Sequence, residues 1–268
     1  MKKKRWIPFL LTGVVLCTGV FLGYHSNYER VMGYISTAKQ EASNEKNAWW
    51  FRRDLEHKRM PAQDKINLEQ YDGYYMGKDE KVIYLTFDCG YENGYTNQIL
   101  DTLKQHKAKA TFFVTKTFIR DNIDLVKRMK EEGHFVGNHT CTHPSMPSKT
   151  TEQLVKEIED CSNFMKENTG YEMERYFRPP MGEYSERTLK LTKELGYKTI
   201  FWSMAYLDYD VNNQPGKAYV VEHFKKYYHN GAIPLIHNVS SSNAEALDEV
   251  LTFLGGEGYT FPNLDELK

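Results

Sequence analysis

Residues 82–94 read VIYLTFDCGYENG, an apolar run that ends at a carboxylate and a bend framed by two glycines. The length and β-branched content of residues 82–85 predict a buried strand, and a helical pattern begins near Thr96. The segment therefore predicts a strand, a turn and a helix. Asp88, at the end of this strand, is either a helix-capping residue or a functional carboxylate at the rim of a scaffold.

The same alternation of strand and helix continues to the C-terminus. Predicted strands cover 82–87, 110–115, 135–138, 176–177, 199–202, 232–236 and 259–261, and predicted helices cover 96–107, 123–132, 151–168, 186–195, 217–228 and 243–254. This order predicts a mostly parallel sheet, either closed into a barrel or doubly wound. No GxGxxG follows the first strand and no GxxxxGK[ST] occurs, so a nucleotide-binding fold loses its main support.

The N-terminus has the pattern of an export or anchor segment. Lys2–Arg5 form a basic cluster, and residues 6–24 contain no charged side chain. That length is close to the ~20 residues that cross a bilayer as a helix, and the basic cluster predicts a cytoplasmic N-terminus. A cleaved signal peptide is the alternative, although no A-x-A-like cleavage site is evident. We expect one N-terminal transmembrane helix with the remaining chain outside the cytoplasm, or a secreted protein if the segment is cleaved.

Composition separates the rest of the chain into two parts. After the membrane segment, 1–25, a polar linker is predicted over 26–72 and a globular domain over 73–268. Trp49-Trp50-Phe51 in the linker either pack onto the domain or contact wall or membrane. A net charge of −1 gives no support for nucleic-acid binding. Three of the four cysteines lie outside the membrane segment, and an odd number cannot all pair internally.

Polar and titratable residues recur where the predicted strands end, which is where a barrel presents its functional side chains. These residues are Asp88, Cys89, His139, His143, Arg178, Trp202, Asp208 and His237. His139 and His143 are four residues apart, so one helical turn would bring both imidazoles within reach of one metal ion. Cys89 is either a further metal ligand or a small buried hydrophobe. Arg178 precedes two prolines, and on that stiff turn its guanidinium is expected to hold a carboxylate as a bidentate pair.

The ordered motifs TFDCG, HTCTH, RPPMG, the segment 202–208 and PLIH resemble the five motifs of the polysaccharide deacetylase family. This family, carbohydrate esterase family 4, shares the NodB homology domain, and the resemblance covers residues 81–268. The string TFDCGYENGYT, the segment 49–77 and NAEALDEV are similar to one subgroup. That subgroup is the delta-lactam-biosynthetic N-acetylmuramic acid deacetylases, which act on spore-cortex peptidoglycan. The expected fold is thus an α/β one, a distorted or incomplete (β/α) barrel of about seven parallel strands.

The resemblance implies a hydrolase that removes acetyl groups from N-acetylmuramic acid in peptide-stripped peptidoglycan. Its site would hold a divalent metal, Zn²⁺ first among the candidates. Carried over to this chain, the roles are as follows: Asp88 as general base, Arg178 as its partner, His237 as general acid, Asp208 orienting His237, His139 and His143 as metal ligands, and Tyr91, Pro180, Trp202 and Leu235 in the substrate pocket. The alternatives are deacetylation of N-acetylglucosamine in peptidoglycan or a chitin-like polymer, and a catalytically impaired wall-binding homologue.

Cys89 is the main departure from the family pattern. Most members carry a second Asp there as the third metal ligand, and the muramic subgroup often has Asn. The Cys89 thiolate either ligates the metal or stays out of its shell, which leaves the metal's identity open. Cys141 lies between the two histidines and could therefore approach Cys89. A disulfide between Cys141 and Cys89 would disable the site.

Overall fold

The computed structural model describes residue 33, residues 42–62 and residues 66–267. The predicted membrane helix, residues 6–24, lies outside this part of the chain. Among the described residues, none forms a helix that is both long enough and apolar enough to span a bilayer. Residues Ser43–Lys268 form one compact unit.

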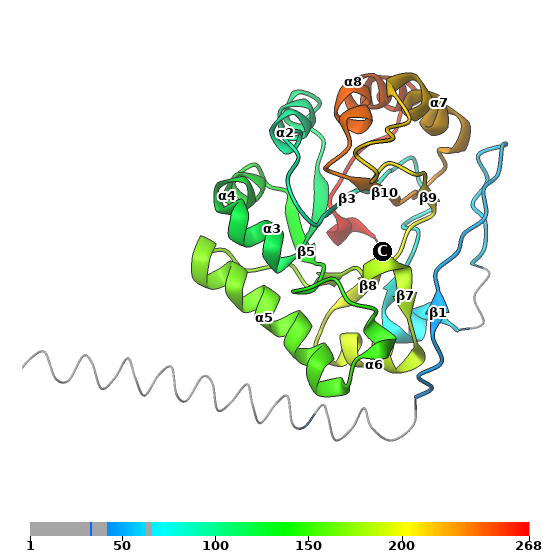
Figure 1. Ribbon diagram of the computed structural model, residues 1–268. Coiled ribbons are helices and arrows are strands. Elements are labelled where there is room, and N and C mark those ends of the chain that lie inside the picture. The colour runs from blue at the N-terminus through cyan, green and yellow to red at the C-terminus, as the bar shows by residue number, and fades with distance from the viewer. Residues whose placement is uncertain (1–32, 34–41, 63–65, 268) are drawn as a thin grey trace, which may run out of the picture. The chain divides into compact units, whose positions relative to one another are not determined.

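A sheet of eight strands lies at the centre of this unit (Figure 1). In spatial order the strands are β2 (Gly73–Tyr74), β8 (Lys198–Ile200), β6 (Tyr176–Phe177), β5 (Phe135–Asn138), β4 (Ala110–Val114), β3 (Leu85–Cys89), β10 (Pro234–His237) and β9 (Met204–Ala205). Every neighbouring pair is parallel. Because β2 and β9 are the two edges, the described strands make an incomplete barrel, which confirms the predicted α/β class and the open form of the barrel.

The strand count differs from the prediction of about seven. The predicted terminal strand 259–261 is wrong, because only Thr260 forms an isolated bridge, to Val82. The short strands β2 and β9 replace it, and each has two residues, too few to leave a period of two in the sequence. A separate antiparallel pair joins β1 (Asn47–Ala48) to β7 (Glu183–Tyr184).

Helices surround the strands on the outside (Figure 1). They are α2 (Thr96–Gln105), α3 (Lys116–Asp121), α4 (Ile123–Glu131), α5 (Thr151–Thr169), α6 (Glu186–Glu194), α7 (Lys217–Tyr227) and α8 (Ser241–Gly256), with short 3-10 turns at Leu68–Tyr71, Met146–Ser148, Pro180–Gly182 and Leu264–Glu266. All six helices predicted for the globular domain are present, and among the helices named here only the short α3 was not predicted. The sequence sets the ends of α5 well: Thr150 and Gln153 form a capping box, and Gly170 ends the helix at a φ of 81°.

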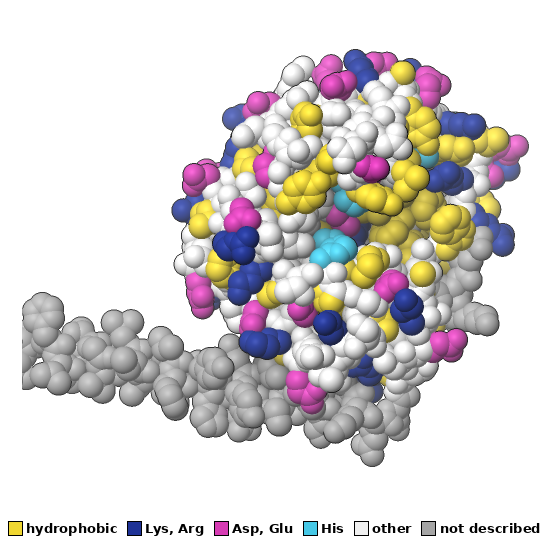
Figure 2. All heavy atoms as spheres, in the orientation of Figure 1, with side chains coloured by type: hydrophobic (Ala, Val, Ile, Leu, Met, Phe, Trp, Pro, Cys, Tyr) yellow, Lys and Arg dark blue, Asp and Glu magenta, His cyan; other side chains and the backbone are white. Residues whose placement is uncertain are grey.

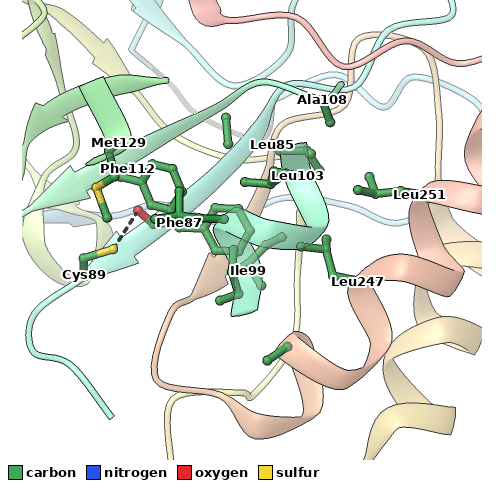
Figure 3. Close-up of a cluster of buried hydrophobic side chains, with 14 of the residues drawn as sticks. Leu85, Phe87, Cys89, Ile99, Leu103, Ala108, Phe112, Met129, Leu247 and Leu251 are labelled. Atoms are coloured by element: carbon green, nitrogen blue, oxygen red, sulfur yellow. Dashed lines mark hydrogen bonds between the residues drawn. The ribbon is translucent and has the colours of Figure 1, made fainter. Parts of the chain in front are cut away.

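Strand β3 separates the core from the inner face of the barrel. Leu85, Phe87 and Cys89 point into the main hydrophobic cluster beneath α2 and α8 (Figure 3). Since successive side chains of a strand point to opposite faces, Thr86 and Asp88 point the other way. One strand therefore supplies both a core wall and a functional carboxylate.

Part of the segment predicted as a linker packs onto the domain. Trp49 is 5% exposed, its ring stacks on Phe201 at 4.7 Å, and its Nε1 donates to the carbonyl oxygen of Trp202 at 2.8 Å. Its neighbour Trp50 is 68% exposed. The compact unit thus begins before the predicted boundary at residue 73, because burial of one indole fixes the segment that carries it.

Candidate active site

A cleft of about 640 Å³ opens at the carboxyl ends of the central strands. Asp88, His139, His143 and His237 all line it, although they come from β3, from β10 and from the loop after β5. In the space-filling view, histidine side chains lie in a hollow on one face, and hydrophobic side chains form much of its rim (Figure 2). The arrangement brings four predicted site residues to one place, as expected for parallel strands whose carboxyl ends share an edge.

Asp88 is held by a buried arginine. The Nη1 of Arg178 donates to Asp88 Oδ1 at 2.8 Å, and its Nη2 donates to Thr86 Oγ1 at 2.8 Å. The predicted bidentate pair is therefore wrong, because the second arm of the guanidinium is used by Thr86. Burial opposes ionisation of Asp88, but the charge and hydrogen bond of Arg178, together with the nearby His237, outweigh it and keep the pKa of Asp88 below its usual value.

Arg178 itself is 0% exposed. Its Nε donates to the carbonyl oxygen of Ile200 at 3.1 Å, and its Nη2 donates to that of Phe201 at 3.2 Å. The guanidinium also lies 4.4 Å from the ring centroid of Phe113. A buried charge needs a partner and satisfied hydrogen bonds. The carboxylate, the backbone oxygens and the ring meet that need, so the arginine is fixed in position.

His139 and His143 meet through an irregular loop. Their ring centroids are 4.8 Å apart, but the expected helical turn is wrong, because residues 139–143 contain no helix. Thr140 and His143 instead have φ values of 70° and 56°. Glu157 of α5 holds the loop: its Oε2 accepts from the backbone N–H groups of Cys141 and Thr142 at 2.9 and 2.8 Å.

The donor atoms of the two histidines fit a metal ion. His139 Nδ1 lies 2.8 Å from the carbonyl oxygen of Arg178, so this nitrogen carries the proton and Nε2 keeps its lone pair. Nε2 lies 3.5 Å from Asp88 Oδ2. Burial lowers the pKa of His139 to about 4 and also lowers that of His143, so both imidazoles are neutral, the state in which they bind metals.

Cys89 does not complete this set. It is 0% exposed, its Sγ donates to the carbonyl oxygen of Phe87 at 3.8 Å, and it lies among Phe87, Phe112 and Met129 (Figure 3). Burial raises the pKa of the thiol well above its usual value, which disfavours the thiolate that a metal requires. Over the described ranges, no group of three His, Cys, Asp or Glu side chains is arranged to hold a metal. The residues present fit an ion held by two histidines, with other positions open to water or substrate.

His237 faces the cleft from the end of β10, and a buried carboxylate holds it. Asp208 Oδ1 lies 2.6 Å from His237 Nδ1, and its Oδ2 accepts from the backbone N–H of His237 at 2.8 Å. Burial alone would lower the pKa of His237, but the adjacent Asp208 raises it overall. Asn243 of α8 donates to Asp208 Oδ2 at 2.7 Å, and Tyr206 donates to the Asn243 amide oxygen at 2.7 Å.

The predicted pocket residues fall into two groups. Tyr91, Trp202 and Leu235 line the cleft, whereas Pro180 does not. The turn that Pro180 begins buries its ring, and its neighbours Pro179 and Met181 take the place at the cleft wall. Gly182 follows at a φ of 65°, and a Cβ there would come 2.7 Å from the Trp202 ring. This glycine therefore lets Trp202 form the wall.

Sequence reasoning missed Tyr209 and Asn238 as cleft residues. Asn238 directly follows His237 and is 0% exposed. Its amide donates to the carbonyl oxygen of Tyr91 at 3.0 Å and to Thr96 Oγ1 at 3.0 Å. It thereby connects the end of β10 to the loop after β3. The sequence signal that could have identified Asn238 is its position directly after His237, a titratable residue at the end of a strand.

Comparisons with known proteins agree with this geometry. The family model named Polysaccharide deacetylase matches residues 76–200. Bacillus subtilis PdaA, a peptidoglycan-N-acetylmuramic acid deacetylase, is 48% identical over 227 residues, which cover 84% of this chain and 86% of that protein. The solved structure of Bacillus subtilis PdaA, a family 4 carbohydrate esterase, matches with a TM-score of 0.81 and 47% identity over 84% of this chain and 97% of its own.

Two other relatives differ from PdaA in the activity that is assigned to them. The peptidoglycan-N-acetylglucosamine deacetylase of Bacillus cereus is 38% identical over 70% of this chain and 89% of its own. A family 4 pseudoenzyme from Bacillus anthracis has a TM-score of 0.68 and 30% identity over 73% of this chain and 68% of its own. With nearly half of the residues identical to PdaA across most of both chains, this chain belongs to the polysaccharide deacetylase family, the family 4 carbohydrate esterases.

Proposed function

We propose that this chain is an enzyme that removes the acetyl group from N-acetylmuramic acid in peptidoglycan, within the muramic delta-lactam pathway of the spore cortex. The observation that carries the proposal is the register of β3 and β10, in which Asp88 and His237 are paired. A base kept ionised and an imidazole whose pKa is raised thereby face one cleft. The name of the PdaA relative supports the choice of muramic acid.

The chain's own groups supply the proton transfers that amide hydrolysis needs. Water adds to the amide carbon, and the products are an amine and acetate. Asp88 accepts the proton that the attacking water loses, while Arg178 keeps the carboxylate ionised and fixed. His237, oriented by Asp208, donates a proton to the departing nitrogen, which leaves poorly as an anion. Base and acid therefore act on opposite sides of the reacting carbon.

We infer that His139 and His143 hold a divalent metal, most simply zinc. When bound, such an ion polarises the amide carbonyl and lowers the pKa of water. The lone pair of His139 Nε2 and the neutral state of both imidazoles support this inference. Because Cys89 does not bind the ion, coordination positions stay open. An ion that binds water and substrate at the same time needs such open positions.

A catalytically impaired wall-binding homologue is the second candidate. The orientation of Cys89 favours it, because the chain lacks the second Asp that serves most family members as the third metal ligand. One similar structure is also that of a pseudoenzyme. Asp88, which is hydrogen-bonded to Arg178, lines the same cleft as His237. The retention of these three residues argues for catalysis, since glycan binding requires none of them.

Acetate release tests the proposed activity. Full-length protein loaded with zinc is incubated with peptidoglycan whose stem peptides have been removed by an amidase, because the subgroup that this chain resembles acts on such glycan. We expect acetate from wild-type protein and none from Asp88→Asn. Equal glycan binding by both forms with no acetate from either would support the impaired homologue.

We also propose that the chain is anchored in the cell membrane by residues 6–24, with Ser43–Lys268 outside the cytoplasm. The basic cluster at residues 2–5 and the uncharged run after it support this topology. Protease added to intact protoplasts should remove an epitope placed at the C-terminus. Protection of that epitope until the membrane is permeabilised would overturn the proposed orientation.

A further inference from the structure

The loop that carries the two histidines has a second link to α5 besides Glu157. Cys141 lies between His139 and His143 and packs against the hydrophobic cluster that contains Cys161. Both cysteines are free thiols, and the two side chains interact with each other. Its backbone N–H also donates to the carbonyl oxygen of Glu157 at 3.1 Å. Glu157 and Cys161 are one helical turn apart on α5, so their side chains lie on the same face of the helix, towards the loop.

The two thiols differ in access. Cys161 is 0% exposed and its Sγ donates to the carbonyl oxygen of Val114 at 3.7 Å. Cys141 is half-buried and lines a surface pocket of about 400 Å³ beside Lys116 and Thr142. A dissolved disulfide reagent therefore reaches Cys141 first and Cys161 only through it.

We propose that Cys141 and Cys161 are a redox pair, whose disulfide fastens the loop bearing His139 and His143 to α5. This pairing also accounts for the odd number of cysteines outside the membrane segment, since Cys89 remains a thiol in the core. It replaces the expected approach of Cys141 to Cys89.

The oxidation balances with a small-molecule disulfide as oxidant. Cys141 attacks one sulfur of oxidised glutathione, which forms a mixed disulfide and releases one reduced glutathione. Cys161 then attacks the Cys141 sulfur, forms the protein disulfide and releases the second glutathione. The two protein thiols are oxidised and one glutathione disulfide is reduced to two thiols.

The consequence is a covalently fixed histidine loop. Thr140 and His143 have left-handed φ values, a conformation that non-glycine residues keep only when their surroundings impose it. In the reduced protein, hydrogen bonds from Cys141 and Thr142 to Glu157 impose it. The disulfide would add a bond that closes residues 141–161 into a ring and removes freedom from the unfolded chain.

Peptide mapping tests the pairing, and it does not depend on the proposed activity. Full-length protein in detergent is reduced, exposed to oxidised glutathione, alkylated under denaturing conditions and digested with trypsin. Each cysteine then lies in a different tryptic peptide: 6–30, 82–104, 131–149 and 157–166. We expect peptide 131–149 joined to peptide 157–166, with the link lost on reduction.

Two outcomes would overturn the proposal: alkylated Cys141 and Cys161 after exposure to excess oxidant, or peptide 131–149 joined to peptide 82–104. The effect of the bond is measured by thermal unfolding of the same samples. Oxidation should raise the Tm of wild-type protein by on the order of 5–10 °C, and it should leave Cys141→Ser unchanged. A cross-linked protein with the Tm of the reduced form would contradict the fastening role.

Discussion

Asp208 binds His237 at two points, at Nδ1 over 2.6 Å and at the backbone N–H over 2.8 Å. One buried carboxylate thus fixes both the ring and the strand end that carries it. Asn243 and Tyr206 extend the chain of hydrogen bonds behind it. The proposed acid is therefore held by a network that begins on α8, far along the sequence from the base.

Removal of that carboxylate should move the basic limb of the pH profile. Burial lowers the pKa of His237 and Asp208 raises it, so Asp208→Asn should lower the pKa of the proposed acid. Activity then falls at a lower pH than in wild-type protein. The check is kcat/KM for acetate release between pH 5 and pH 10. Asp210→Asn, an exposed neighbour, should leave the limb in place, whereas an unmoved limb in Asp208→Asn would contradict the assignment of His237 as acid.

Arg178→Ala should destabilise the fold strongly. It leaves the Asp88 carboxylate buried without its partner and frees Thr86 Oγ1 and two backbone oxygens. Breaking a buried pair typically costs about 3–5 kcal/mol, a loss that urea unfolding can measure. Arg175→Ala is the matched control, because Arg175 is exposed and its 3.7 Å pair with Glu159 is only partly buried. A loss of less than about 1 kcal/mol is expected. Similar losses in both variants would contradict the role of Arg178.

Metal affinity should depend on His143 and not on Cys89. Removal of one of the two ligands should weaken zinc binding by at least the roughly 10–100-fold that loss of an outer-shell partner costs, whereas Cys89→Ala changes a side chain on the core face of β3. Competition with a chromophoric chelator measures both affinities. If Cys89→Ala weakened zinc binding as much as His143→Ala, the two-histidine site would be wrong.

Substitutions of Trp49 and of its neighbour Trp50 test whether the segment before residue 73 is docked on the domain. Trp49→Ala removes a buried indole that stacks on Phe201 and donates to the Trp202 carbonyl oxygen. We expect a loss of about 3–5 kcal/mol in the free energy of unfolding. Trp50→Ala, at a 68% exposed position, should change it by less than about 0.5 kcal/mol. Equal losses would show that the segment is not docked as described.

Stability should fall as the pH drops from 6.5 towards 4. Burial lowers the pKa of His134 and of His223 to about 4. Their unfolded forms bind protons at a higher pH, so their contribution is complete above about pH 6.5 and is lost between there and pH 4, at about 1.4 kcal/mol per pH unit and group. Urea unfolding at several pH values measures this slope. His223→Phe should reduce it, and an unchanged slope would contradict a neutral buried His223.

Much of the site could be predicted because the sequence marks strand ends. Asp88, Arg178 and His237 each follow an apolar run, and parallel strands bring such ends together. Cys89 was left open because the predicted strand ended at Phe87. The structure extends β3 by two residues, and the alternation of side chains then turns Cys89 into the core.

Other features depend on geometry that leaves no periodic signal. The histidine loop uses left-handed residues in place of a helical turn, and Pro180 is buried by the turn that it begins. The pair of Cys141 with Cys161 depends on where α5 packs, and sequence spacing gives no indication of that contact. The two-residue strands β2 and β9 were missed for a similar reason, because tertiary pairing alone defines them.

The most direct test of the central claim is mass spectrometry of muramidase digests of peptide-stripped glycan after incubation with the zinc-loaded full-length protein. The account predicts that muramic acid residues lose an acetyl group with wild-type protein and keep it with Asp88→Asn. Loss of acetyl from glucosamine alone, or from neither sugar, would contradict it.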